Sequence, residues 1–589
     1  MTVDASVLGA GTARPRSATA RYLVPGTAAA KVVFSKTPLS FLMGVDTDTG
    51  KILDLHHPLK GTEIDGRVLA IPCGRGSCSA SGAIVELLLN RCAPAALIFH
   101  RLEEILTLGV LIAKELFEAS IPVVLLEDAD AWSALSHADI VSITADALEI
   151  VANDGEKLRL SLNSAGKDQV QLSGTDREMI AGKHGEATRI AMEMIVSFAA
   201  MQGARSLTDV SQVHIDACVY VGESSLLIPE KLHSLGAKLA VPTTCNSLSA
   251  DQQRWRELGA DPEVSVAASK IGDLYMAMGA QQSFTCAPYL LDTQPKAGEQ
   301  VGWAESNAVV FANSVLGART QKYPDYLDVF IGLTGRAPFA GCHLDAGRIP
   351  SICVVVPRVE EYDDTFFPLL GYHIGDLVGS SIPLVMGIEE TKPSIADLKG
   401  FGAGFATSSS SPMFHIVGVT PEAEAHTSTA TELEKIVIHP EDLLSTWSRL
   451  NSANGTSVDM IALGNPHFSI QEFERLATLC NGKIKHEDVS FMVTTSRDIY
   501  QKALRAGYLD ELERFGARIV TDTCWCMIAE PVIAPSARTI MTNSSKYAHY
   551  GPGIVKKDFY FAPLDVCVAA AGTGQMPSDR RQPFSLAAS

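Results

Sequence analysis

Four short apolar runs near the carboxyl end of the chain constrain its fold more than any other feature. Each run ends abruptly in small polar residues, which is typical of a buried parallel strand that presents functional groups at its carboxyl end. The runs cover residues 458–463, 489–493, 518–521 and 539–541. The loops behind them carry His467, Arg497, Cys524 and the segment 543–549. Because parallel strands end at the same edge of a sheet, we expect these side chains to converge there.

The length of 589 residues exceeds what one hydrophobic core normally serves, so we expect two or more domains. Short apolar runs alternate with helical patterns from residue 32 to about 150, which predicts a compact α/β domain. Residues 150–170 are polar and largely without periodicity, and we place the domain boundary there. The expected order is a flexible lead over 1–20, a small domain over 21–155, a large domain over 156–572 and a flexible tail over 573–589.

Local signals in the large domain predict individual elements. Thr175 and Glu178 have the spacing of a capping box, and a helix is expected from there to about Met201. Residues 213–216 and 238–241 are expected strands, and 266–279 a helix. The glycine- and serine-rich segment 400–411 is expected to be flexible.

Charge and cysteine usage narrow the class of protein. The formal net charge of −19 opposes a nucleic-acid partner, since such binding depends on Lys and Arg neutralising phosphates. No apolar run approaches the roughly 20 residues that span a bilayer. Twelve cysteines without a C-x-x-C pair or a secretory signal favour reduced thiols in a cytoplasmic protein. Acidic residues are scarce near the start of the chain, as they are in organellar targeting segments, and we keep such a segment as the minority interpretation.

One loop of the small domain is rich in glycine and serine. Residues 72–81, PCGRGSCSAS, lie between a predicted strand and a predicted helix. Glycines allow close backbone approach and a helix start offers free N–H groups, so the loop suits a carboxylate or a phosphate. It lacks the Lys-Ser/Thr of a Walker A loop, and a plain tight turn explains the same residues.

An ordered series of motifs resembles the aconitase X family over roughly residues 20–570. The small domain contributes SFLMGVD, HHPL and GRGSCSAS. The large domain contributes VPTTCNSLSAD, YMAMGAQQSFTCAPYL, WAESNAVVFANSVLGART, GLTGRAPFAGCHLDAGR, GNPH, DTCW and TNSSKYAHY. The resemblance implies an α/β fold in which a small swivelling α/β domain is fused to a large, aconitase-like, multi-layer α/β catalytic domain.

The resemblance also implies an iron–sulfur hydro-lyase whose small domain closes over the substrate. Single-chain members are similar to enzymes that dehydrate cis-3-hydroxy-L-proline to Δ1-pyrroline-2-carboxylate, and two-chain archaeal members to mevalonate 5-phosphate dehydratases. Because this chain is fused, we expect the first activity and keep the second as the alternative. Many large subunits have Gly-Cys-Pro-His where this chain has Gly464-Asn465-Pro466-His467, so one expected cluster thiol is missing.

Cys286 and Cys524 are the expected cluster ligands, because each lies in a matched motif directly after a predicted strand. We expect Cys353 as the third ligand, ahead of Cys342 and Cys526. A 2Fe–2S cluster is favoured over 3Fe–4S or 4Fe–4S, and thiolates suit any of these. The alternative for a single cysteine is a small buried apolar residue.

Dehydration next to a carboxylate needs a base for the Cα proton and a Lewis acid for the leaving hydroxyl. Ser77 is the expected base or substrate-anchoring hydroxyl, and His57 and Lys546 are further catalytic candidates. Substrate-binding candidates are Arg75, Ser79, Glu305, Asn307, Arg319, Arg348, His467 and His549. In the alternative interpretations the loop around Ser77 only turns the chain, His57 is structural, and the arginines form buried pairs with Glu.

Two further classes of function remain open. Some aconitase relatives bind RNA after losing their cluster, which the charge of −19 opposes here. A metal-free protein that binds a small ligand is the other. The partner we expect is a small hydroxy-imino acid, with no nucleic acid and no membrane, for a monomer or a small homo-oligomer.

Overall fold

The chain forms two compact units. The computed structural model describes residues 19–54, 56–75, 79–164, 166–578 and 582–586. The units are Met1–Gly166 and Lys167–Ser589, so the division falls within the segment 150–170 but after residue 155. Throughout the described ranges each cysteine is a free thiol. No helix among the same residues combines the length and apolarity that crossing a membrane requires.

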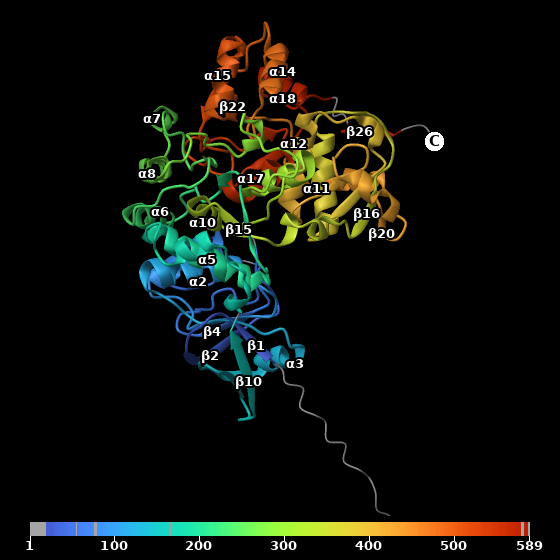
Figure 1. Cartoon of the computed structure of the whole chain (residues 1–589). Coiled ribbons are helices and arrows are strands. Elements are labelled where there is room, and N and C mark those ends of the chain that lie inside the picture. The colour runs from blue at the N-terminus through green and yellow to red at the C-terminus, as the bar shows by residue number, and fades with distance from the viewer. Residues whose placement is uncertain (1–18, 55, 76–78, 165, 579–581, 587–589) are drawn as a thin grey trace, which may run out of the picture. The chain divides into compact units, whose positions relative to one another are not determined.

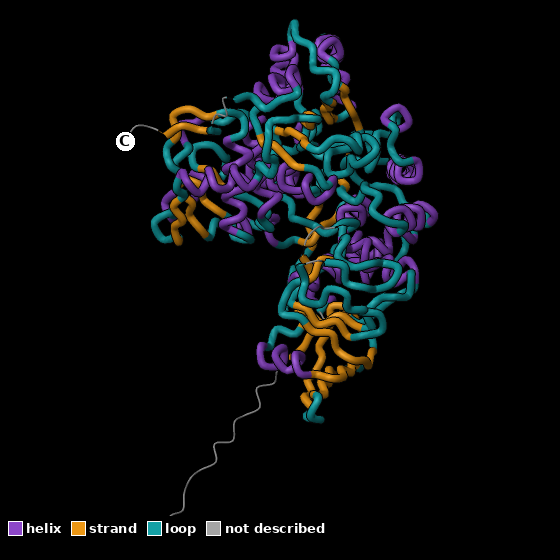
Figure 2. The backbone as a smooth tube through the Cα atoms, turned by 180° about the vertical axis from the view of Figure 1, so that it is seen from behind, coloured by secondary structure: helices purple, strands orange, loops and turns teal. Residues whose placement is uncertain are grey.

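The first unit is a closed barrel whose strands follow the order β1-β10-β9-β8-β2-β4-β6-β7. Figure 2 shows these strands gathered together in orange. The strands are β1 (Thr19–Val24), β2 (Ala28–Phe34), β4 (Val68–Ile71), β6 (Ala96–Phe99), β7 (Val123–Leu125), β8 (Ala138–Ile143), β9 (Ala147–Ala152) and β10 (Lys157–Ser164). The helices of the unit are α1 (Ala80–Leu89), α2 (Ile105–Phe117) and α3 (Ala129–Ala134). The apolar strand runs fill the barrel interior.

The segment 150–170 is not patternless. It contains the end of β9 and all of β10, which pair as an antiparallel hairpin. Leu158, Leu160 and Leu162 alternate with exposed polar residues and pack into the barrel. This period of two is the signal of a strand with one face in the core, and the polar residues between the leucines concealed it.

A five-stranded sheet of the second unit confirms the strands expected near the carboxyl end. Its order is β23-β22-β21-β24-β25, and every neighbouring pair is parallel. The strands are β21 (Met460–Leu463), β22 (Ser490–Thr495), β23 (Arg518–Thr521), β24 (Thr539–Thr542) and β25 (Asp558–Phe561). The accompanying helices are α14 (Ile470–Cys480), α15 (Arg497–Arg505), α16 (Tyr508–Phe515), α17 (Ser545–Val555) and α18 (Leu564–Thr573). Figure 1 shows β22, α14, α15 and α18 in orange to red.

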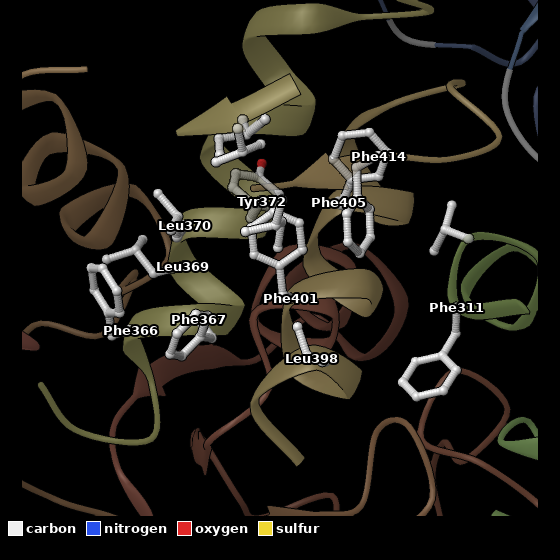
Figure 3. Packing of buried hydrophobic residues seen from close by; sticks show 14 of the residues in the cluster. Phe311, Phe366, Phe367, Leu369, Leu370, Tyr372, Leu398, Phe401, Phe405 and Phe414 are labelled. Carbon is white, nitrogen blue, oxygen red and sulfur yellow. The ribbon is translucent and has the colours of Figure 1, made fainter. Parts of the chain in front are cut away.

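A second layer contains the parallel sheet β19-β18-β16-β20. Its strands are β16 (Ile352–Val355), β18 (Pro383–Met386), β19 (His415–Ile416) and β20 (Glu434–Val437), and its helices α11 (Phe366–Val378), α12 (Ile395–Ser408) and α13 (Pro440–Arg449). Figure 3 shows aromatic side chains of α11 and α12 gathered with Phe311 and Phe414 in one core. The rings of Phe401 and Phe414 meet edge to face, with centroids 4.6 Å apart.

Most of the segment 400–411 is helical, so the expected flexible patch is wrong. Residues 400–408 belong to α12, which packs on α11. A Cβ on Gly404 would lie 2.3 Å from the carbonyl oxygen of Pro368, and one on Gly371 would lie 2.1 Å from that of Phe401. The glycines are therefore required by close helix packing, and helix burial outweighs their weak helix propensity.

The amino-terminal part of the second unit holds the parallel sheet β13-β12-β14 and the ribbon β11-β15. The strands are β11 (Leu207–Asp209), β12 (Val213–Ile215), β13 (Thr243–Cys245), β14 (Gly302–Trp303) and β15 (Arg336–Pro338). The helices are α4 (Gly174–Ile180), α5 (Glu186–Gln202), α6 (Ser224–Ser234), α8 (Pro262–Met278), α9 (Ser306–Phe311) and α10 (Leu327–Thr334).

Three local expectations for this unit are wrong. The helix expected from residue 175 to 201 is two helices, α4 and α5, and the capping box is formed by Ser173 with Asp176, whose buried carboxylate also binds Arg336. The strand expected at 238–241 lies at Thr243–Cys245. The tail is not wholly irregular, because β26 (Phe584–Leu586) pairs with β17 (Val359–Tyr362) and buries Phe584.

Candidate active site

Three loops and the starts of helices α9 and α17 bring the functional groups of the second unit together. The loop of Cys286 runs beside β13, since the Thr285 amide donates to the carbonyl of Cys245 at 3.0 Å. Glu305 and Asn307 lie at the start of α9. The remaining groups lie at the carboxyl edge of the five-stranded sheet, where parallel α/β sheets place their ligands. Asn465 and His467 follow β21, Cys524 and Cys526 follow β23, and Lys546 lies in the first turn of α17.

Two residues of one loop link three thiols. The backbone amide of His467 donates to Cys286 Sγ at 3.4 Å, and Asn465 Nδ2 donates to Cys526 Sγ at the same distance. Cys526 in turn hydrogen-bonds Cys524. Cys286 is buried, whereas Cys524 and Cys526 are half-buried. The structure therefore brings Cys286 and Cys524 together, as expected, and adds Cys526.

The thiols differ in their readiness to ionise. The hydrogen bond from Cys524 lowers the pKa of Cys526 to about 6, and the nearby Lys546 ammonium supports the thiolate against the effect of burial. The same hydrogen bond raises the pKa of Cys524 well above its usual value. Burial raises the pKa of Cys286 to about 11, and the Glu305 carboxylate adds to the effect. The shared hydrogen bond thus favours the thiolate at Cys526 over that at Cys524.

Lys546 and Glu305 form an ion pair beside these thiols. Lys546 Nζ lies 3.1 Å from Glu305 Oε1, and both side chains are largely buried. Burial lowers the pKa of Lys546, but Glu305 and the three thiols raise it well above its ordinary value. Asn307 connects the pair to the thiol loop, because its Nδ2 donates to the Cys286 carbonyl at 3.0 Å and hydrogen-bonds Glu305. The carboxylate, the ammonium and the amide were all expected at the site.

His467 joins the two thiol-bearing loops. Its Nε2 hydrogen-bonds the Thr523 carbonyl at 2.8 Å, and its Nδ1 the Thr285 hydroxyl at 3.1 Å. Both partners immediately precede a cysteine of the site. Burial lowers the pKa of the imidazole to about 4, so the ring is neutral near pH 7. This geometry makes His467 a link between the loops, whereas the sequence suggested a substrate ligand.

Other expected site residues of the second unit have different neighbours. Cys353 lies on β16, with Sγ 3.7 Å from Met386 Sδ, and its neighbouring charge is Lys435. Arg319 pairs with Asp345, Arg348 pairs with Glu422, and His549 Nδ1 hydrogen-bonds the Tyr372 hydroxyl at 2.9 Å. The structure does not bring these groups to the three thiols. Cys526, which we placed behind Cys353 as the expected third ligand, is the thiol that lies with Cys286 and Cys524.

The candidates in the first unit have partners of their own. Arg75 pairs with Asp54 at 2.5 Å. His57 is buried, where its Nε2 hydrogen-bonds the Thr37 carbonyl at 3.0 Å and its Nδ1 accepts from the Leu59 amide at 3.2 Å. Ser79 immediately precedes α1. Ser77 lies outside the described residues, so its role stays a prediction.

The three thiols do not stand in a finished metal geometry. Among the described residues, no three His, Cys, Asp or Glu side chains are arranged to hold an ion as they stand. A cavity of about 290 Å³ is lined by Asn465, Lys399 and Ser545, among others, but by none of the thiols. The donor set nevertheless fits an iron–sulfur site, with three sulfurs, of which Cys526 ionises most readily, beside a compensating ammonium.

Four consecutive stretches of the chain match domains of one family. They match the Aconitase X swivel domain over residues 17–152, the first domain over 169–346, the second over 350–448 and the third over 458–573. Together these matches cover both units.

Curated proteins and a solved structure are similar to the chain. It is 50% identical over 567 residues to a cis-3-hydroxy-L-proline dehydratase of Hypocrea jecorina, covering 94% of each chain. It is 46% identical to a cis-3-hydroxy-L-proline dehydratase of Pseudomonas aeruginosa, covering 95% of this chain and 97% of that one. The holo-form crystal structure of Thermococcus kodakaraensis aconitase X matches with a TM-score of 0.62 and 28% identity, over 68% of this chain and all of that one.

Proposed function

The chain belongs to the aconitase X family, and on that premise we propose that it is a hydro-lyase that dehydrates cis-3-hydroxy-L-proline to Δ1-pyrroline-2-carboxylate. The observation that carries the proposal is the similarity to two dehydratases of this substrate over nearly the whole of each chain. The geometry of the site also supports the proposal, because it groups three thiols with a carboxylate and an ammonium: Cys286, Cys524, Cys526, Glu305 and Lys546.

The reaction removes a proton from C2 and hydroxide from C3 of the ring. The C2–H electrons form the C2=C3 bond as the C3–O bond breaks, and the resulting enamine tautomerises to the ring imine. A group that accepts the C2 proton and a group that stabilises the leaving oxygen are both needed. The site must also hold the substrate carboxylate, whose charge opposes loss of the neighbouring proton.

Cys286, Cys524 and Cys526 are the residues that would hold an iron–sulfur cluster. Three sulfur donors fit this group, and Asn465, where many relatives carry cysteine, stands beside Cys526 as a hydrogen-bond donor. We therefore replace Cys353 by Cys526 in the proposed ligand set and keep 2Fe–2S as the favoured cluster. A bound cluster with an open coordination position supplies a Lewis acid for the leaving hydroxyl.

Lys546 acts as a cation in this proposal. Its raised pKa keeps it protonated near neutral pH, so it cannot be the base that takes the C2 proton. Its ammonium compensates thiolate charge and can donate a hydrogen bond to the departing oxygen or to the carboxylate. Glu305 holds it in place from 3.1 Å. Ser77 remains our candidate for the base, and His57 is assigned to positioning the loops of the small unit.

The first test is direct. The full chain is purified without oxygen, its iron and sulfide are measured, and it is incubated with cis-3-hydroxy-L-proline and, in parallel, mevalonate 5-phosphate. We expect iron and sulfide in the protein, a cyclic imine from the first compound and no product from the second. Turnover of mevalonate 5-phosphate alone would replace the proposal by its alternative.

We further propose that the protein works in the reducing cytoplasm, with no nucleic-acid or membrane partner.

The second test addresses Lys546. Lys546→Met should lower kcat by about 100-fold or more, since a positioned cation at developing negative charge typically contributes that much. Lys557→Met is the matched control, because Lys557 is similarly buried and pairs with Glu530 at 2.9 Å. The control should keep kcat within about twofold. Equal losses in both variants would show that activity does not depend specifically on the cation at the thiols.

A further inference from the structure

Two buried residues with a positive φ each lie two positions before a cysteine of the site. Phe284 has φ of 34° and precedes Cys286 by two residues, and Asp522 has φ of 66° and precedes Cys524 by two. Both side chains are fully buried. Non-glycine residues rarely adopt positive φ, and such strain persists only where the surroundings enforce it. Each thiol loop therefore needs something that holds its turn.

Arg497 contacts both of these residues. Its Nε and Nη2 donate to Oδ1 and Oδ2 of Asp522 at 2.6 Å and 2.7 Å, which is a bidentate pair. Its guanidinium carbon lies 5.6 Å from the centre of the Phe284 ring, within the range of a cation–π contact. Nη2 also donates to Gln252 Oε1 at 3.0 Å. One planar group thus engages the turns of both loops.

The surrounding contacts fix the same two turns. The Asp522 carbonyl accepts from the Leu248 amide at 2.6 Å, and Asp522 Oδ2 accepts from the Gln252 amide at 3.2 Å. A Cβ on Gly272 would lie 2.9 Å from Cζ of Phe284, so helix α8 packs directly on that ring. Arg497 lies at the start of α15, where β22 ends. The guanidinium therefore reaches these turns from the carboxyl end of β22, a third strand of the parallel sheet besides β21 and β23.

We infer that Arg497 is a positioning residue that holds the Cys286 and Cys524 loops in register, so that sulfurs from distant parts of the chain can share one cluster. The inference rests on the proposed cluster and assigns to it a residue that touches none of the sulfurs. Lysine cannot replace the arginine, because an ammonium offers neither the bidentate fork nor the flat face that stacks on the ring. Loss of such an outer partner typically weakens metal binding by about 10–100-fold.

The test compares Arg497→Lys with Arg336→Lys in the full chain. Arg336 makes an equivalent bidentate pair with buried Asp176, at 2.9 Å and 3.2 Å, and the two arginine side chains are 15% and 18% exposed. After anaerobic reconstitution with iron and sulfide, each variant and the unchanged chain are mixed with an iron chelator. We expect Arg497→Lys to lose iron about tenfold faster or more, and Arg336→Lys to lose it at the unchanged rate despite a similar fall in Tm. Equal rates in the two variants would overturn the inference.

A second measurement needs no metal. Amide hydrogen exchange in the metal-free chain should accelerate about tenfold or more at residues 284–286 and 522–526 in Arg497→Lys, and not in Arg336→Lys. Unchanged exchange in these segments overturns the inference. An unchanged chain that binds no iron overturns the proposed cluster, while the exchange result still decides whether Arg497 holds the loops. If Arg497→Lys does not fold, Asp522→Asn takes its place in both measurements with the same expected outcomes.

Discussion

The charge of the candidate site is set by a few side chains in a buried place. The Lys546 ammonium faces the Glu305 carboxylate at 3.1 Å and the ionisable thiols of Cys286, Cys524 and Cys526. Burial makes each of these charges costly alone, and their mutual attraction offsets that cost. The pair of Cys524 and Cys526 shares one hydrogen bond, which favours a thiolate at Cys526. A thiolate at Cys526 thus suits the proposed cluster.

Replacing the third thiol tests the ligand set. Cys526→Ser should lower the iron content of the anaerobically reconstituted chain to less than about half, because a serine oxygen is a poor ligand for iron that sulfur binds. Cys353→Ser should leave the iron content unchanged, since Cys353 lies on β16 beside Met386. Iron and sulfide per chain, with the visible absorbance, provide the measurement. Loss of iron in Cys353→Ser but not in Cys526→Ser would reverse our assignment.

The pH dependence of activity should respond to Glu305. The carboxylate raises the pKa of Lys546, so the active ammonium persists to high pH in the unchanged enzyme. Glu305→Gln removes that charge, and the fall of kcat/KM on the alkaline side should therefore begin at lower pH. A profile of kcat/KM from pH 6 to 10 makes the comparison. An alkaline limb that stays in place would show that Lys546 titration does not govern activity.

At the scale of elements, helix packing explains why a glycine-rich segment is ordered. The helices α11 and α12 approach so closely that glycines on each meet backbone atoms of the other. Gly404 faces Pro368 and Tyr372 of α11, whereas Gly402, on the same helix, faces only the side chain of Val310. Position on the helix, and not composition, decides which glycine is required.

Gly404 and Gly402 of α12 should respond differently to alanine. Gly404→Ala should lower the free energy of unfolding by about 1–3 kcal/mol, because the new Cβ would meet the Pro368 carbonyl at 2.3 Å. Gly402→Ala should be neutral or stabilise by up to about 1 kcal/mol, since its Cβ would lie at 3.5 Å from Val310 and alanine favours the helix. Chemical denaturation of both variants provides the measurement. A similar loss in both would contradict the packing argument.

At the scale of the whole molecule, the two units have different constructions. The first is a closed barrel whose core is lined by alternating strand residues, and the second consists of sheets covered by helices.

Several imidazoles are buried as neutral groups in the second unit. Burial lowers the pKa of His214 and of His343 to about 3, and both rings hydrogen-bond neighbouring side chains.

These histidines predict a loss of stability in acid. Their folded pKa values lie below the ordinary value near 6.5, so between pH 6.5 and about 3 the unfolded chain binds protons that the folded chain does not. The free energy of unfolding should therefore fall as pH drops through this window, by about 1 kcal/mol per pH unit for each histidine. His343→Gln should flatten the slope, as measured by denaturation from pH 7 to 5. An unchanged slope would mean that His343 does not contribute.

Local patterns were sufficient to predict much of the fold. The four carboxyl-terminal strands, the barrel strands around residues 68–71 and 96–99, and helix α2 follow from apolar periodicity, which short-range contacts obey. The loops that follow two of those strands also indicated Cys524 and Lys546, because parallel strands end at one edge. Cys286 was indicated by its family motif, and the strand expected before it is absent, since it lies in the loop after α8. Motif order added the family, and with it an expected activity that composition could not supply.

Tertiary structure decided which groups meet. Cys353 and Cys526 are both cysteines near strands, but Cys526 lies near Cys286 whereas Cys353 lies beside Met386. Arg497 acquires its role from Asp522 and Phe284, which are 25 and more than 200 positions away along the chain. The glycines of α12 and the alternating leucines of β10 likewise have roles that depend on the residues packed against them. Sequence patterns report the conformation of neighbours along the chain, whereas a site is made by contacts between residues that folding alone brings together.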